Sequence, residues 1–252
     1  VIVGAGLNGL LAASKFIDTD YDVLILEQDN ILGGSLNSSQ KIKTIDNLDT
    51  RAWLKKTEDL IKKSKNIKIL KNTLATSYNQ INHIIALEDN SVGKPLASHK
   101  PELILHKIRT KHTILSNGHI ERLISFRNND LPGIMLAGSF EKYIFRYGVI
   151  PEAEPIIFTN NSSTFSLLKS LVDLGCKPKA YIDARDESSI EKGTKNILEK
   201  NKISFYFGSE VEGCDGNKKL ETISIRNKEK NIEKVSGSML CISGGLNPDV
   251  HL

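Results

Sequence analysis

The chain has 252 residues, of which 39% are hydrophobic, 6% aromatic and 25% charged, and its 34 Lys and Arg against 30 Asp and Glu give a formal net charge of +4. This length allows one large domain or two of ordinary size, and the composition excludes a disordered tail, a collagen-like chain and a small disulfide scaffold. The basic residues are scattered rather than clustered with aromatic residues, so the charge does not indicate a nucleic-acid partner.

The sequence also gives no sign of a membrane partner. Its best apolar run, Leu131–Phe140, is far shorter than the roughly 18 residues that a membrane span requires. The cysteines are odd in number and far apart, which favours a reducing compartment, and we expect the protein in the cytoplasm. The three are Cys176, Cys214 and Cys241.

The N-terminal residues are predicted to form a βαβ unit. Val1–Val3 is a short β-branched run, apolar residues follow at helical spacing from Leu7 to Ile17, and Asp22–Glu27 is an apolar run of strand length that ends in a carboxylate. The two strands of such a unit should lie parallel and buried. Further along, we expect a helix over 51–64, antiparallel strands over 66–70, 79–87 and 103–109, and a short buried strand over 111–116.

The second half of the chain repeats the alternation of strands and helices. We expect strands over 155–159, 178–182, 203–207 and 238–243, helices over 162–174 and 188–201, and a hairpin of 220–227 with 231–236. The whole pattern predicts an α/β fold. It consists of two Rossmann-like, doubly wound, three-layer domains of the dinucleotide-binding type with a β-meander, the second inserted in the first.

We expect the first domain over 1–154, the inserted one over 155–237, and the start of the return to the first domain over 238–252. The chain begins at Val1 inside an apolar run and stops at Leu252 soon after a Gly-Gly-Leu-Asn-Pro turn. For this reason we expect it to be part of a longer protein.

A glycine-rich turn between the first strand and the first helix carries the clearest chemical signal. Gly4-Ala5-Gly6-Leu7-Asn8-Gly9 fits the G-x-G-x-x-G pattern of dinucleotide-binding proteins. In this pattern Gly4 permits a tight turn, Gly6 lets a pyrophosphate approach the backbone, and Gly9 lets the helix pack against the strand. The helix N-terminus then offers unpaired N–H groups and the positive end of a dipole to the phosphates.

A carboxylate and two further glycine turns lie where a dinucleotide would extend. Glu27 ends the second predicted strand 23 residues after Gly4, close to the roughly 20 expected for the acid that binds a ribose hydroxyl. A carboxylate here also argues against a 2′-phosphate, because two negative groups would share one pocket. Gly33-Gly34-Ser35 and Asn117-Gly118 are each consistent with a plain turn or with a close approach to the cofactor.

The second unit lacks the glycine motif. Its first strand leads into Asn160-Asn161-Ser162-Ser163, where Ser162 or Ser163 can cap the following helix and side chains stand where a pyrophosphate needs bare backbone. Asp183 ends the next strand, and we interpret it as a solvated or capping acid. We therefore expect the second unit to be a poor dinucleotide binder.

Neither a metal site nor a disulfide relay is predicted. The cysteines form no C-x-x-C pair, and the histidines show no metal-binding spacing. The histidines are His83, His99, His106, His112, His119 and His251.

Taken together, these features resemble the flavoprotein disulfide reductase fold with its two dinucleotide domains. A narrower resemblance, to the α subunits of heterotetrameric sarcosine oxidases, covers nearly the whole chain. Subunits of the opine oxidase and hydrogen cyanide synthase type are similar enough to be confused with them. The blocks that carry this resemblance are Asn117–Arg122, Asn129–Gly138, Tyr143, Arg146–Val149, Phe158–Asn161 and Ser243–Pro248.

The resemblance implies an oxidoreductase complex that demethylates sarcosine with oxygen, giving glycine, hydrogen peroxide and a one-carbon unit for tetrahydrofolate. It implies β, γ and δ subunits as partners, amine oxidation at FAD on another subunit, FMN near the α–β contact, and a folate-binding domain further along the chain. The first site of this chain would hold NAD, with FAD as the alternative. Other readings left open are a stand-alone FAD-dependent NAD(P)H oxidoreductase and a cofactor-stabilised assembly scaffold.

The resemblance also assigns roles to residues, none of them catalytic. Gly4, Gly6 and Gly9, with Ala5, Leu7 and Asn8 between them, would take the pyrophosphate. Glu27 would take the adenosine ribose with Gln28 beside it, and Gly34 and Ser35 would take the far side of the dinucleotide. Asn117-Gly118 stands where related flavoproteins carry Thr-Gly, and Ser116 where they usually carry Ala.

Overall fold

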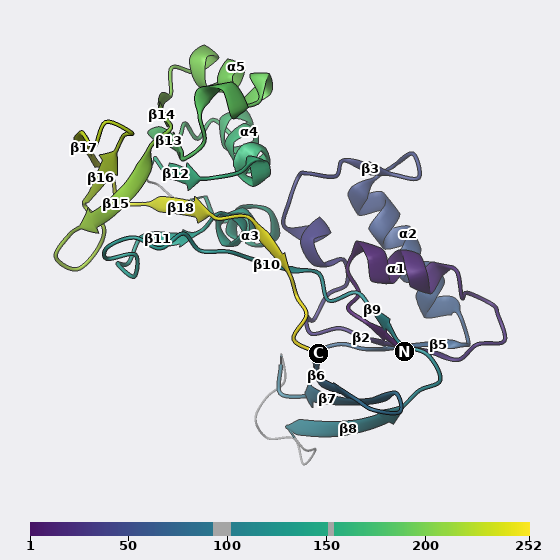
Figure 1. The fold of residues 1–252 in the computed structure, drawn as a ribbon. Helices are drawn as coiled ribbons and strands as arrows, with labels where there is room; N and C mark the ends of the chain where they lie inside the picture. The colour runs from purple at the N-terminus through teal and green to yellow at the C-terminus, as the bar shows by residue number, and fades with distance from the viewer. Residues whose placement is uncertain (93–101, 151–153) are drawn as a thin grey trace. The chain divides into compact units, whose positions relative to one another are not determined.

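The computed structural model describes residues 1–92, 102–150 and 154–252, which are drawn as a ribbon in Figure 1. The chain divides into two compact units. The first unit comprises Val1–Asn37, Ile42–His119 and Pro248–Leu252, and the second comprises Ser38–Lys41 and Ile120–Asn247. The domain boundaries expected from the sequence, after residues 154 and 237, remain predictions.

The first unit is built around a four-stranded sheet in the order β5-β2-β1-β9, in which every neighbouring pair is parallel. Alternate side chains of its strands point to opposite faces. Ile2 and Ile25 pack with the helices α1 and α2, whereas Val3 and Leu26 pack with the β-meander. The bounds are β1 Ile2–Val3, β2 Val23–Leu26, β5 Ile67–Leu70, β9 Ile114–Leu115, α1 Leu7–Ser14 and α2 Thr50–Lys63.

The first unit therefore has three layers. Figure 1 shows α1 and α2 on one side of the parallel sheet and the antiparallel meander β6-β7-β8 on the other. A short antiparallel pair, β3 and β4, precedes α2, and the 3-10 turn η1 follows β2. The bounds are β6 Thr73–Asn79, β7 His83–Asp89, β8 Leu103–Arg109, β3 Thr44–Ile45, β4 Leu48–Asp49 and η1 Gly34–Asn37.

The second unit has a five-stranded parallel sheet in the order β11-β18-β12-β13-β14. Its strands are buried along their whole length at β12, β13 and β18, as expected for a parallel sheet covered on both faces. The bounds are β11 Ile134–Leu136, β12 Ile156–Thr159, β13 Ala180–Asp183, β14 Ser204–Phe207 and β18 Leu240–Ser243.

Three helices cover one face of this sheet and an antiparallel sheet covers the other. Ile157 and Tyr181 pack with α3, α4 and α5, whereas Ile156 and Phe158 pack with the β15-β16-β17 sheet. The bounds are α3 Ala137–Tyr147, η2 Ser162–Thr164, α4 Phe165–Asp173, η3 Glu187–Ser189, α5 Lys192–Lys200, β15 Glu210–Asp215, β16 Thr222–Arg226 and β17 Ile232–Ser236. Two further strands, β10 His119–Glu121 and β19 Leu246–Pro248, pair with each other.

The predicted α/β fold class is confirmed, since each unit combines a parallel α/β sheet with a small antiparallel sheet. The insertion of the second domain in the first stays a prediction. Three strand predictions were wrong in detail. Residues 66–70 are the parallel strand β5, because α2 crosses back over the sheet. The strand expected over 79–87 is interrupted by a turn with positive φ at Ile81 and Asn82, which separates β6 from β7. The buried strand expected over 111–116 is only β9, and its Leu115 is 49% exposed.

Several elements had no counterpart in the prediction. The longest helix and strand among them in the second unit are α3 and β15, and the others include β3, β4, β6, β10, β11 and β19. Within the described residues, no helix has both the length and the apolar character that a membrane crossing demands.

Candidate functional site

The glycine turn follows β1 and is shaped by two close backbone contacts. A Cβ atom at Gly4, which has a φ of +91°, would lie 2.4 Å from the carbonyl oxygen of Ser116. A Cβ atom at Gly9 would lie 1.9 Å from the carbonyl oxygen of Gly4. Both distances are far below van der Waals contact, so Gly4 accepts no side chain while Ser116 lies beside it, and Gly9 accepts none while α1 packs on β1 in this way.

Gly6 is different, because a Cβ atom there would meet nothing within 4 Å. It is the N-cap residue of α1 and provides no side-chain cap, so the first N–H groups of the helix have no side-chain partner from this position. Leu7 is half-buried against the core, and the side chain of Asn8 is exposed. Open space beside bare backbone at a helix N-terminus is what a pyrophosphate requires.

Glu27, at the end of β2, forms a hydrogen bond with this turn. Its side chain is only 5% exposed, and its Oε2 accepts a hydrogen bond of 2.7 Å from the N–H of Ala5. Its Oε1 accepts one of 2.8 Å from the N–H of Asp29. Burial raises the pKa of the Glu27 carboxyl, and these two N–H donors oppose that rise. Each oxygen has a second lone pair that can accept a ribose hydroxyl, and the side chain of Gln28 is exposed beside it.

Gly33 and Gly34 pass directly against the glycine turn. The N–H of Gly33 donates to the carbonyl of Ala5 at 2.8 Å, and Gly33 forms an isolated parallel bridge with Gly6. A Cβ atom at Gly34, where φ is +52°, would lie 3.2 Å from the Cα of Gly6. Ser35 follows with an exposed side chain. The sequence left this Gly-Gly pair open between a plain turn and a close approach to the cofactor, and the structure places it against the glycine turn.

Asn117 and Gly118 follow β9, the other neighbour of β1, and hold the segment that contains Asp249. The amide nitrogen of Asn117 donates to the carbonyl of Asp249 at 3.3 Å, and the N–H of Asp249 donates to the carbonyl of Gly118 at 3.1 Å. The Oδ1 of Asn117 is buried without a protein partner. Asp249 has no local sequence signal, and sequence reasoning missed this contact.

All of these residues therefore lie at the carboxyl ends of β1, β2 and β9. In open α/β sheets this edge is where ligands bind. The open space at Gly6, the N-terminus of α1 and the carboxylate of Glu27 fit the ADP part of a dinucleotide. The described residues contain no group of His, Cys, Asp or Glu that could hold a metal ion, and His99 lies outside them.

The corresponding edge of the second unit is filled by side chains, and two expectations for it were wrong. Asp183 is not solvated but fully buried, at 0% exposure, and pairs with Arg185. The helix cap is not Ser162 or Ser163 but Asn161, whose Oδ1 accepts a hydrogen bond of 2.8 Å from the N–H of Ser163.

Comparisons with known proteins agree with this geometry. Residues 2–53 match the family model of the NAD(P)-binding Rossmann-like domain. The chain is 30% identical over 254 residues to "Sarcosine oxidase subunit alpha" of Rhizobium meliloti (strain 1021), an alignment that covers 100% of this chain and 25% of that protein. It is 31% identical over 263 residues to the protein of the same name from Corynebacterium sp. (strain U-96), covering 100% of this chain and 26% of that one. The chain thus spans about a quarter of the length of these relatives.

Solved structures share the fold at low identity. Thioredoxin reductase of T. acidophilum superposes with a TM-score of 0.74 at 15% identity, covering 99% of this chain and 77% of that one. L-proline dehydrogenase from P. horikoshii superposes with a TM-score of 0.62 at 19% identity, covering 99% and 42%. Over its whole length, then, the chain is similar to one part of sarcosine oxidase subunit alpha, and it carries a NAD(P)-binding Rossmann-like domain, as the sequence motifs predicted.

Proposed function

We propose that this chain is the dinucleotide-binding part of a sarcosine-oxidase-like alpha subunit. One observation carries the proposal. The glycine turn, Glu27 and the Gly33-Gly34 pair meet at one sheet edge, in a chain whose full length is similar to such subunits. The reaction would be the oxidative demethylation of sarcosine with oxygen, giving glycine, hydrogen peroxide and a one-carbon unit for tetrahydrofolate.

The residues of the first unit would bind the cofactor rather than act on the amine. N–H groups at the start of α1 would donate to the diphosphate beside Gly6, because no side chain intervenes there. Glu27 would accept from the adenosine ribose, and Gly34 with Ser35 would border the far side. The buried Oδ1 of Asn117 has no hydrogen-bond donor from the protein, and a bound water or a cofactor group would supply one. Once bound, a nicotinamide or flavin dinucleotide supplies two-electron redox chemistry.

NAD is the cofactor that we propose for this site, with FAD as the alternative. Both share the ADP moiety that the glycine turn and Glu27 read. NADP is disfavoured, because a 2′-phosphate would face the buried carboxylate of Glu27, which is only 5% exposed. Amine oxidation would take place at FAD on another subunit, with FMN at the contact between the α and β subunits.

The proposal also includes partners and a location. The chain would assemble with β, γ and δ subunits, tetrahydrofolate would bind a separate domain of the alpha subunit, and the complex would work in the cytoplasm. Because this chain spans about a quarter of its relatives, we expect no complete reaction from it alone.

Oxygen uptake tests this proposal. The full-length protein would be expressed alone and with its candidate β subunit, and oxygen consumption measured with and without sarcosine. We expect sarcosine-dependent uptake with hydrogen peroxide release only from the assembled subunits. No sarcosine-dependent oxygen uptake from the assembled subunits would contradict the proposal. A yellow isolated protein that NADH bleaches would instead support a stand-alone FAD-dependent NAD(P)H oxidoreductase.

A further inference from the structure

The strand registers show which residue of the second unit is equivalent to which residue of the first. In the first unit, the step beyond the last pair of β1 and β2 brings Gly4 beside Glu27. In the second unit the last pair of β12 and β13 joins Thr159 to Asp183. Thr159 therefore holds the place of Gly4, and Asp183 holds the place of Glu27.

Continuing along the chain, Asn161 holds the place of Gly6 and Thr164 that of Gly9. Thr164 is only 1% exposed, and its Oγ1 lies 2.9 Å from the hydroxyl of Tyr181. A helix cannot approach its strand as closely here as in the first unit, where the position of Gly9 leaves no room for a Cβ atom. Accordingly α4 begins six residues after Thr159 and follows the 3-10 turn η2, whereas α1 begins three residues after Gly4.

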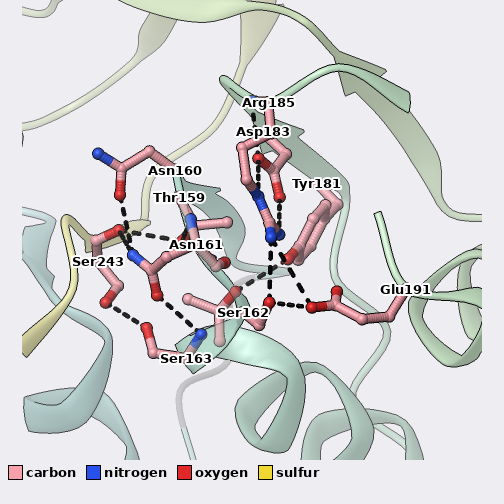
Figure 2. A network of polar contacts seen from close by, with 11 residues as sticks. Thr159, Asn160, Asn161, Ser162, Ser163, Tyr181, Asp183, Arg185, Glu191 and Ser243 are labelled. Atoms are coloured by element: carbon pink, nitrogen blue, oxygen red, sulfur yellow. Dashed lines mark hydrogen bonds and ion pairs between the residues drawn. The ribbon is translucent and has the colours of Figure 1, made fainter. Parts of the chain in front are cut away.

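The crevice between β12 and β18 is closed by hydrogen bonds (Figure 2). The Nδ2 of Asn161 donates to the carbonyl of Ser243 at 3.1 Å, and the Oγ1 of Thr159 lies 3.0 Å from the same carbonyl. The hydroxyls of Ser163 and Ser243 lie 2.7 Å apart. This is the point where the strand order reverses, and in doubly wound sheets a ligand enters there. In the second unit the polar groups of this crevice bond to one another.

Arg185 forms hydrogen bonds with further polar groups at this edge, namely Asp183 and Ser162. Its Nε and Nη2 donate to the two oxygens of the Asp183 carboxylate at 3.1 and 2.8 Å. Its Nη1 donates to the Ser162 hydroxyl at 3.0 Å, and Figure 2 shows Ser162 bonded in turn to Glu191. The Nη1 of Arg185 also lies 3.8 Å from the Glu191 carboxylate. Two carboxylates thus face one guanidinium, whose Nε, Nη1 and Nη2 donate to groups of the second unit itself.

We infer that the second unit takes no dinucleotide because its own side chains occupy the nucleotide-binding edge, and that Arg185 is the positioning residue that keeps this edge closed. The chain as a whole then binds one dinucleotide, in the first unit. No hydride passes inside this chain between two bound dinucleotides, although the fold is that of thioredoxin reductase. This inference rests on the proposed function only for the identity of the ligand in the first unit.

Counting bound dinucleotides tests the inference. The purified full-length protein, stripped of cofactor, would be titrated with NADH and with NADPH by fluorescence and calorimetry. We expect at most one equivalent to bind to the wild type and none to Gly6→Asp, whose carboxylate enters the open space of the first site. Asn161→Asp makes the matched change in the second unit and should leave the stoichiometry of the wild type unchanged.

The outcomes separate the two claims. Two bound equivalents in the wild type would overturn the inference. So would binding to Gly6→Asp that is lost when Asn161→Asp is added to the same protein. No binding to the wild type would contradict NAD in the first site and favour FAD there, while supporting a closed second unit.

Hydrogen exchange tests the role of Arg185. Arg185→Lys keeps the charge but loses the fork that engages both oxygens of Asp183. We expect the amides of residues 162–164 to exchange about tenfold faster in this variant, with no change at Gly4–Gly9. Should Arg185→Lys not fold, Ser162→Ala removes one contact of Arg185 with less disturbance, and a smaller acceleration is expected. Unchanged exchange in a folded Arg185→Lys variant would overturn the assignment.

Discussion

At the scale of single residues, the glycines of the motif have two separate roles, close backbone packing and open access to the backbone. Gly9 is required by the packing of α1 on β1, because a Cβ atom there would lie 1.9 Å from the carbonyl oxygen of Gly4, and Gly4 by the close approach of Ser116, whose carbonyl oxygen would lie 2.4 Å from its Cβ atom. Gly6 faces open space, so no packing contact requires a glycine there. The sequence motif predicted the tight turn at Gly4 and the close packing at Gly9, since both follow from the spacing of glycines between a strand and a helix, and the approach of a pyrophosphate to Gly6 stays a prediction.

A matched pair of alanine variants separates these tasks. Gly9→Ala should lower the stability of the protein by more than about 2 kcal/mol, because the new methyl group forces α1 away from β1. Gly6→Ala should cost less than about 1 kcal/mol. Urea unfolding followed by circular dichroism measures both. Equal losses of stability would contradict the packing account.

At the scale of elements, the sequence predicted what local patterns encode and missed what distant contacts decide. The strands β12, β13 and β18 are continuous apolar runs and were predicted. The helix α3 was missed, because Pro132, Gly133 and Gly138 weaken any local signal around its start. Its first turn is instead capped from a distance, by the Glu121 carboxylate that accepts a 2.7 Å hydrogen bond from the N–H of Gly138. The strand β15 was missed because it contains a bulge between Val211 and Gly213.

A buried carboxyl group between α3 and α4 gives the stability a pH dependence. Glu141 is 6% exposed, and its Oε1 accepts a 2.7 Å hydrogen bond from the hydroxyl of Ser166. Burial raises the pKa of Glu141, and the bond from Ser166 opposes the rise. A raised native pKa means that the native state holds this proton more tightly than the unfolded chain does. The stabilisation is therefore complete below the ordinary pKa of 4.5 and is lost as the pH rises through the raised value.

Glu141→Gln removes this titration and keeps an acceptor for Ser166. We expect the variant to gain melting temperature over the wild type as the pH rises from about 4.5 to neutrality. The exposed Glu199→Gln on α5 serves as the control and should follow the wild type. Melting curves of Glu141→Gln that run parallel to those of the wild type at every pH would contradict this account.

At the scale of the whole molecule, the two α/β units were predictable because each repeats the alternation of strand and helix. The composition of each unit was not, since Ser38–Lys41 and Pro248–Leu252 group with residues far away in sequence. The contact of Asp249 with Asn117 and Gly118 likewise joins residues more than a hundred positions apart. No local periodicity encodes such a pairing. The sequence predicted bare backbone at the first turn and side chains at the second, but the network around Arg185 required the structure, because it depends on strand register.

The central claim is that the first unit binds a dinucleotide at the glycine turn, and the small molecule released from the purified protein tests it most directly. Mass spectrometry and absorbance of the material freed by denaturing the full-length protein identify the cofactor and its amount. We predict NAD, or FAD as the alternative, in a near-equimolar amount from the wild type and none from Gly6→Asp. A protein that releases no dinucleotide, or a Gly6→Asp variant that releases as much as the wild type, would contradict the account.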